Sequence, residues 1–165
     1  MKKALYAGSF NPFTNGHLEM VKEASNIFDE VYVCIAVNAE KALSFHEDEI
    51  RKKIDAISRS IGEANIPNVK VIFYSGMIAN LCKELGVRYL VRGLRNTSDY
   101  LYEENIAKIN CELNPNLMTV YLRSNNEVIS SSLIRELLKY NQDISKYVPG
   151  PILELITENE KNKKN

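Results

Sequence analysis

Residues 3–17 read KALYAGSFNPFTNGH, and this stretch decides the class of fold. It begins with a short apolar run, residues 3–7, whose composition is typical of a buried strand. A turn-rich segment with two glycines and a proline follows at residues 8–17 and leads straight into apolar residues at helical spacing. A buried strand, a loop and a helix in this order form the repeating unit of α/β proteins with a parallel sheet.

The rest of the chain repeats this alternation. Four more runs are short and rich in β-branched or aromatic side chains: residues 31–37, 69–74, 89–91 and 118–122. Apolar residues recur at helical spacing in six segments: residues 18–28, 50–61, 78–85, 100–113 and 133–139, and the segment after Pro151. The pattern predicts an α/β fold with a Rossmann-like, doubly wound, five-stranded parallel sheet and C-terminal helices. Ser44 and Glu47 have the spacing of a capping box and predict the start of the second helix.

Composition sets the number of domains and excludes some classes of partner. The 165 residues are 45% hydrophobic and 25% charged, so we expect one domain over residues 1–157 and a flexible polar tail over residues 158–165. Basic and acidic residues number 21 each, and no net positive field favours nucleic acid. The three cysteines lack C-x-x-C spacing, and no apolar run is long enough to span a membrane. These features predict a cytoplasmic protein with free thiols and neither a membrane nor a nucleic-acid partner.

Right-handed crossovers would bring the loops that follow the strands to one edge of the sheet. These loops hold most of the unusual polar and basic residues: residues 8–17, 38–41, 75–77, 92–95 and 123–132. We therefore expect a small-molecule site there. In the first loop, Gly8 and Gly16 permit close backbone approach, and the helix N-terminus that follows can bind a phosphate. The alternative is a plain turn and helix cap, with His17 merely exposed; the dinucleotide fingerprint and the P-loop motif are both absent.

Three strings in these loops resemble known motifs. Thr14-Asn-Gly-His17, preceded by Gly-Ser-Phe-Asn-Pro, is similar to the (H/T)-x-G-H signature of the nucleotidyltransferase superfamily. Two later strings resemble the bacterial phosphopantetheine adenylyltransferase family: RGLR at residues 92–95 followed by DYLYE at residues 99–103, and ISSS at residues 129–132. The similarity runs in order from Tyr6 to about Val148, which is most of the chain.

The resemblance implies an activity. It is the transfer of the AMP moiety of ATP to 4′-phosphopantetheine, giving dephospho-coenzyme A and pyrophosphate in the penultimate step of coenzyme A synthesis. The acceptor phosphate would attack in line, without a covalent intermediate, and Mg²⁺ would accompany ATP. A homohexamer is also implied. Two alternatives stay open: a nucleotidyltransferase with another acceptor, such as nicotinate or nicotinamide mononucleotide or the acceptor of a cytidylyl group, and a nucleotide-binding module without catalysis.

The resemblance also assigns roles to residues. Those expected to act in catalysis are His17, Lys41 and Arg95. Those expected to bind ATP are Gly8, Ser9, Phe10, His17, Gly93, Arg95, Glu103, Ile129, Ser130, Ser131 and Ser132. Those expected to bind the acceptor are Ser9, Lys41, Ile78, Arg92 and Asn110. No residue is expected to ligate a metal, and Tyr100, Tyr102 and Ile106 are assigned to packing.

These assignments have alternatives in ordinary structure. Arg92 and Arg95 could form surface ion pairs with Glu103 or Glu104. One serine of residues 130–132 could simply cap a helix, Lys41 could be solvated in its loop, and Ile78 could belong to the core. The first loop also departs from the usual G-T-F-D-P of the family. Ser9 keeps a hydroxyl group, whereas Asn11 lacks the negative charge of the aspartate, so we assign no role to Asn11.

Overall fold

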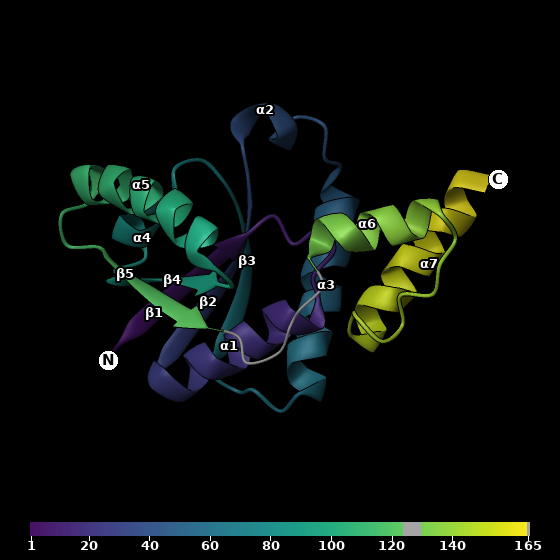
Figure 1. The fold of residues 1–165 in the computed structure, drawn as a ribbon, viewed down its shortest axis with the longest axis horizontal. Helices are drawn as coiled ribbons and strands as arrows, with labels where there is room; N and C mark the ends of the chain where they lie inside the picture. The colour runs from purple at the N-terminus through teal and green to yellow at the C-terminus, as the bar shows by residue number, and fades with distance from the viewer. Residues whose placement is uncertain (124–129, 165) are drawn as a thin grey trace.

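The computed structural model describes residues 1–123 and 130–164. A twisted sheet lies at the centre with helices on both faces (Figure 1). Its strands are β1 (Lys3–Gly8), β2 (Glu30–Val37), β3 (Val69–Ser75), β4 (Tyr89–Leu94) and β5 (Met118–Arg123). All neighbours pair in parallel, in the order β3-β2-β1-β4-β5. The predicted five-stranded, doubly wound parallel sheet is confirmed.

Seven helices are present in the described part of the chain. They are α1 (Asn15–Ile27), α2 (Ala39–Ala42), α3 (Glu47–Glu63), α4 (Ile78–Glu84), α5 (Thr97–Leu113), α6 (Ser131–Lys139) and α7 (Gly150–Lys164). Helix α2 was not predicted, because four residues are too few for a visible apolar repeat. Helix α7 continues past residue 157, so residues 158–164 are helical where the sequence suggests a polar tail.

The two faces of the sheet carry separate apolar cores. Along β1, Ala4 and Tyr6 belong to one core, and Leu5 and Ala7 belong to the other, because successive side chains of a strand point to opposite faces. Helices α1, α3, α6 and α7 contribute to the first core, and α4 contributes to the second. Burial on both faces explains why the strands read as unbroken apolar runs.

The order of the strands creates a switch point beside β1. The chain moves outward from β1 to β2 and β3, then returns to place β4 on the other side of β1. Tyr6 of β1 pairs with Val91 of β4, so the carboxyl ends of these two strands lie side by side. Open α/β sheets bind ligands at this kind of point, where the connections leave neighbouring strands in opposite directions.

The start of α3 differs from the predicted capping box. Ser44 does not cap this helix, because its hydroxyl group donates to the carbonyl of Lys41 at the end of α2, at 2.7 Å. The N-cap residue is His46, whose backbone N–H donates to the carboxylate of Glu49 at 3.4 Å. The capping interaction is therefore shifted by two residues, since the short helix α2 occupies Ser44.

Candidate active site

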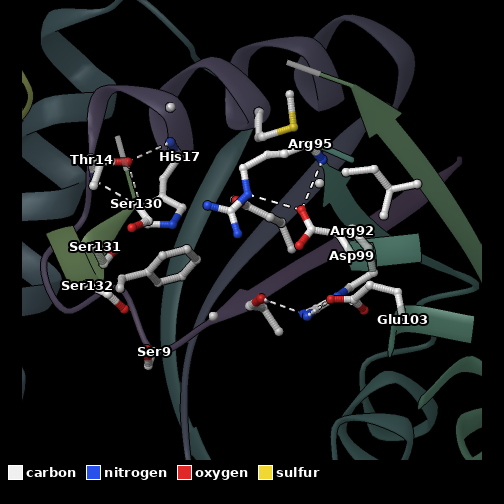
Figure 2. Close-up of a pocket in the computed structure, with 18 of the residues that line it drawn as sticks. Ser9, Thr14, His17, Arg92, Arg95, Asp99, Glu103, Ser130, Ser131 and Ser132 are labelled. Carbon is white, nitrogen blue, oxygen red and sulfur yellow. Dashed lines mark hydrogen bonds and ion pairs between the residues drawn. The ribbon is translucent and has the colours of Figure 1, made fainter. Parts of the chain in front are cut away.

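A cavity of about 530 Å³ opens at the switch point, beyond the carboxyl ends of β1 and β4. Its walls come from β1, the loop after β1, the first turns of α1 and α6, the end of β4 and the start of α5. Figure 2 shows how these segments, far apart in the sequence, turn polar side chains toward one space. The volume lies in the range of small-molecule sites, as expected from the positions of the loops.

The first helix presents His17 to the cavity through a reciprocal cap. Thr14 is the N-cap of α1, and its hydroxyl oxygen accepts from the backbone N–H of His17 at 3.2 Å. In return, Nδ1 of His17 accepts from the backbone N–H of Thr14 at 2.9 Å. Because Nδ1 accepts a hydrogen bond, the proton of the neutral ring is assigned to Nε2. The remaining ring nitrogen of His17 is therefore a hydrogen-bond donor.

The surroundings of His17 keep the ring neutral. The rings of Phe10, Phe13 and Tyr6 lie around it, with centroids 5.0, 5.5 and 6.5 Å away. Burial, with smaller contributions from the positive charges of Arg95 and Lys53, lowers the pKa of His17 to about 4. The imidazole can thus donate a hydrogen bond at neutral pH without carrying a charge.

The loop after β1 is folded tightly against Gly8. Phe10 adopts a left-handed backbone conformation, with φ of 46°, which turns its ring back toward the strand. A Cβ atom at Gly8 would lie 2.8 Å from that ring, closer than side-chain carbons approach. Gly8 is therefore required for this turn, and Phe10 is buried beneath the loop rather than extended into solvent.

Arg92 and Glu103 form a half-buried ion pair at the end of β4. Nε and Nη2 of Arg92 each donate to one carboxylate oxygen of Glu103, both at 2.7 Å, and Nη1 donates to the carbonyl of Ala7 at 2.9 Å. The side chains are 25% and 10% exposed, so this pair is not the surface pair considered as an alternative. The two-point geometry holds the guanidinium plane in a fixed orientation.

The same pair also lines a second, smaller cavity. This space, of about 220 Å³, extends between β4, β5 and α5, and its walls include Ile78 and Asn110. Arg92 and Glu103 are therefore shared between a large polar cavity and a small cavity with mainly apolar walls. The two acceptor residues predicted from α4 and α5 are brought together in this second cavity, which His17 does not line.

Arg95 reaches into the larger cavity from the end of β4. Its Nε donates to Asp99 at 3.1 Å, and the side chain is 55% exposed. Figure 2 shows the guanidinium group extending across the cavity in the direction of His17. Gly93 also lines this cavity, and a Cβ atom there would lie 3.3 Å from the sulfur of Met20.

The serines at the start of α6 are tied into the fold more closely than expected. Ser130 is the N-cap, and its oxygen accepts from the backbone N–H of Leu133 at 3.2 Å. Ser131 donates to the carbonyl of Pro12 at 2.9 Å, and Ser132 accepts from Arg135 at 3.2 Å. All three line the cavity, so the first turn of α6 faces the first loop. Ile129, the remaining predicted residue of this string, lies outside the described residues.

Lys41 is the predicted site residue that the structure leaves apart. It is exposed on the one-turn helix α2, where its backbone N–H donates to Asn38 at 2.8 Å, and it lines neither cavity. The predicted loop at this position is wrong, because the side chain of Asn38 caps a helical turn. A role for Lys41 in phosphate binding stays a prediction.

Several residues that line the cavities or lie behind them were missed or given another role. Tyr102 and Ile106, assigned to packing, line the larger and the smaller cavity. Arg135 lines the larger cavity, and its Nη1 donates to the carbonyl of Asn11 at 2.6 Å. Its position one turn after the serine string was the available signal. Lys53, which donates to the carbonyl of Ser9 at 2.6 Å, lies in α3 with no motif around it.

Neither a metal cluster nor a membrane-spanning helix is found in the part of the chain that the structure describes. Within residues 1–123 and 130–164, no three His, Cys, Asp or Glu side chains come together as metal ligands. The cavity acids, Asp99 and Glu103, are each bonded to an arginine. No described helix is long and apolar enough to cross a membrane.

Fold and site together define the class. A parallel sheet with its switch point at β1, a Thr-x-Gly-His turn that opens α1 and a serine turn that faces it are the features of a nucleotidyltransferase. Residues 5–137 match the cytidylyltransferase-like family. A solved structure, described as a putative nicotinate-nucleotide adenylyltransferase from Vibrio parahaemolyticus, shares this fold with a TM-score of 0.70 and 19% identity. The alignment covers 96% of this chain and 93% of that one.

Two curated relatives narrow the class. Phosphopantetheine adenylyltransferase from Staphylococcus carnosus (strain TM300) is 35% identical over 158 residues, which is 94% of this chain and 95% of the relative. The protein of the same name from Lachnoclostridium phytofermentans is 36% identical, and the alignment covers 94% of this chain and 94% of that relative. The chain belongs to the phosphopantetheine adenylyltransferase family, and the resemblance drawn from the loop motifs is confirmed.

Proposed function

We propose that this protein transfers the AMP moiety of ATP to 4′-phosphopantetheine, forming dephospho-coenzyme A and releasing pyrophosphate. The observation that carries the proposal is the sharing of Arg92 and Glu103 between two cavities of different size and polarity. A transfer between two bound substrates needs two adjoining compartments that meet where the reacting phosphates lie.

The larger cavity is suited to ATP. The first turns of α1 and α6 both line it, and helix N-termini attract phosphate groups through their free N–H groups and dipoles. Arg95 and Arg135 add positive charge on two sides. We assign Gly8, Ser9, Phe10, Gly93, Glu103 and the serines of residues 130–132 to this half of the site, as the family motif implies.

The smaller cavity is suited to the pantetheine arm. Ile78 offers an apolar contact, and Asn110 offers an amide group that can pair with the amides of the arm. Arg92 lines both cavities and would meet the acceptor phosphate where they adjoin. Lys41 would approach the same phosphate from α2.

The chemistry requires no general base, because the acceptor phosphate is ionised at neutral pH. One of its oxygens attacks the α-phosphorus of ATP, the bond from that phosphorus to the bridging oxygen breaks, and pyrophosphate leaves. His17 would donate its Nε2 proton as a hydrogen bond to an α-phosphate oxygen. Arg95 would offset the charge of the leaving group.

We further infer that Mg²⁺ arrives as part of the nucleotide substrate. Asp99 and Glu103, the acids of the larger cavity, are bonded to arginines, and Asn11 has no charge to offer. Mg²⁺ commonly keeps its waters and takes phosphate oxygens as ligands. The residues present thus suit a metal held by the triphosphate.

Two further properties of the family are proposed for this chain. Exposed apolar side chains along α5 and at the start of β5 support assembly into a homohexamer: Leu101, Ile109, Leu113 and Met118. Three free cysteines support a reducing, cytoplasmic setting. Sedimentation of the purified protein tests the first of these proposals.

The decisive experiment measures pyrophosphate release with ATP and one acceptor at a time. We expect turnover with 4′-phosphopantetheine and none with nicotinate or nicotinamide mononucleotide. Turnover with a mononucleotide alone would assign a different acceptor. Binding of ATP without pyrophosphate release for any acceptor would indicate a nucleotide-binding module.

A further inference from the structure

Lys53 lies behind the ATP loop, outside the motifs that define the family. It projects from α3, and its Nζ donates to the carbonyl oxygen of Ser9 at 2.6 Å, across 44 residues of sequence. Ser9 itself lines the larger cavity, next to Gly8 and Phe10. The contact therefore joins a helix of the outer layer to the loop that faces the nucleotide.

Within the part of the chain that the structure describes, no ion pair neutralises the charge of Lys53. The side chain is half-buried. Its neighbour Lys52, by contrast, is exposed and bonds to Glu158 at 2.7 Å. Burial lowers the pKa of the Lys53 ammonium group to about 8. A half-buried cation that is bonded to a neutral carbonyl is stabilised when an anion binds nearby.

The field of Lys53 reaches the reacting centre. Its charge is one of the causes that lower the pKa of His17, the residue whose ring faces the cavity. The position of Lys53 therefore allows it to act electrostatically on a bound phosphate chain without touching it.

Lys53 and Arg135 both donate hydrogen bonds to backbone carbonyls of this loop. Arg135 of α6 donates to the carbonyl of Asn11, two residues after the carbonyl held by Lys53. Between them stands Phe10, in the left-handed conformation that costs most residues about 1 kcal/mol. The two bonds secure both sides of this turn and occupy carbonyl oxygens whose partial negative charges would otherwise repel phosphate.

We propose that Lys53 is a positioning residue of the ATP site: it fixes the Ser9 carbonyl and supplies positive charge behind the loop that receives the triphosphate. Lys53 thus acts on the polyphosphate chain of ATP and not on the adenine or the acceptor. This inference rests on the proposed binding of ATP in the larger cavity.

The test compares ATP with adenosine, which lacks the phosphates, by calorimetry on the full chain without acceptor. Lys53→Met should weaken ATP binding by about tenfold and leave adenosine binding unchanged. Lys53→Arg, which keeps the charge, should bind ATP within about threefold of the parent protein. Lys52→Met, which makes the same change to the neighbouring lysine, is the matched control and should have no effect. Lys53→Gln gives a second neutral variant if the methionine variant does not fold.

Kinetics add a readout that a purely structural role would not give. Lys53→Met should raise the KM for ATP and leave the KM for 4′-phosphopantetheine unchanged. Equal ATP affinity in Lys53→Met and the parent protein would overturn the inference, as would an equal loss of ATP and adenosine binding. If the parent protein binds ATP but shows no turnover with 4′-phosphopantetheine, the proposed acceptor is wrong while the role of Lys53 still stands.

Discussion

The ring of His17 is fixed by the backbone of Thr14: the Thr14 N–H donates to Nδ1 at 2.9 Å and leaves the Nε2 proton facing the cavity. The Thr-x-Gly-His motif thus caps α1 and also fixes the tautomer of the His17 ring. The intervening residues place the cap and the ring one helical turn apart, and Gly16 is buried and lines the larger cavity.

Replacing His17 should separate chemistry from binding. We expect His17→Ala to lower kcat by about 10²- to 10³-fold, because a preorganised donor to the charge that develops on the α-phosphate is lost. Binding of ATP should change by less than about threefold, since this hydrogen bond strengthens mainly in the transition state. Steady-state kinetics and calorimetry check both values. Near-normal turnover would remove His17 from the mechanism.

The protonation of His17 should be shifted to acid pH. With the pKa lowered to about 4 by burial, NMR signals of the ring should show a neutral Nε2–H imidazole from about pH 5 upward. The unfolded chain takes up this proton near pH 6.5 and the folded protein does not. The free energy of unfolding should therefore decrease as the pH falls from 6.5 to 4, and His17→Gln should reduce that slope. Titration of the His17 ring near pH 6.5 would contradict the structure.

The ion pair of Arg92 and Glu103 should contribute more to the free energy of unfolding than the surface ion pairs do. Glu103→Gln leaves the half-buried guanidinium without its counter-charge, and we expect the free energy of unfolding to fall by about 2–4 kcal/mol. Glu154→Gln breaks the exposed pair with Arg59 and should cost less than about 1 kcal/mol. Urea denaturation of both variants makes the comparison. Equal effects would mean that Arg92 finds another partner or solvent.

Much of this architecture follows from local patterns. Strands β1, β2 and β4 are predictable because burial on both faces makes them apolar runs. The edge to which the following loops lead is predictable from the handedness of the crossovers, whereas the order of the strands is not. The cavity residues carried by loop motifs, such as His17 and Ser130, are predictable for the same reason: their position follows from the strand or helix beside them.

Residues that enter the site from other layers are not predictable in this way. Lys53 lies in an amphipathic helix among other charged residues, and only the packing of α3 against the sheet turns it toward Ser9. Tyr102 and Ile106 lie one turn apart on the same face of α5, so the placement of that helix along the sheet decides which cavity each one lines. Lys41 is the opposite case: its position in the family motif predicts a site residue, but it lies on a short exposed helix and lines neither cavity.

Substitutions in the smaller cavity should weaken binding of the acceptor and leave binding of ATP unchanged. Asn110→Ala removes the buried amide that faces this space, and we expect the KM for 4′-phosphopantetheine to rise by about tenfold or more. The KM for ATP should stay within about twofold, because Asn110 does not line the larger cavity. A parallel rise in both constants would show that the two compartments are not independent.

Gly8 should tolerate no side chain. In Gly8→Ala the new methyl group would lie 2.8 Å from the Phe10 ring, and that ring is only 2% exposed and packed against Phe13, 5.3 Å away between centroids. The ring cannot swing outward, so the loop itself must move. We expect a loss of about 1–3 kcal/mol in the free energy of unfolding and a weaker affinity for ATP.

Gly62→Ala provides the matched control for this loss. A Cβ atom at Gly62, in the last turn of α3, meets nothing within 4 Å, so the same substitution should stabilise the helix by up to about 1 kcal/mol. In thermal unfolding, the melting temperature should therefore fall for Gly8→Ala and stay the same or rise for Gly62→Ala. In calorimetry, the affinity for ATP should fall for Gly8→Ala and stay unchanged for Gly62→Ala. A Gly8→Ala protein that retains both stability and ATP affinity would show that the tight turn over Gly8 is not needed to hold the nucleotide loop.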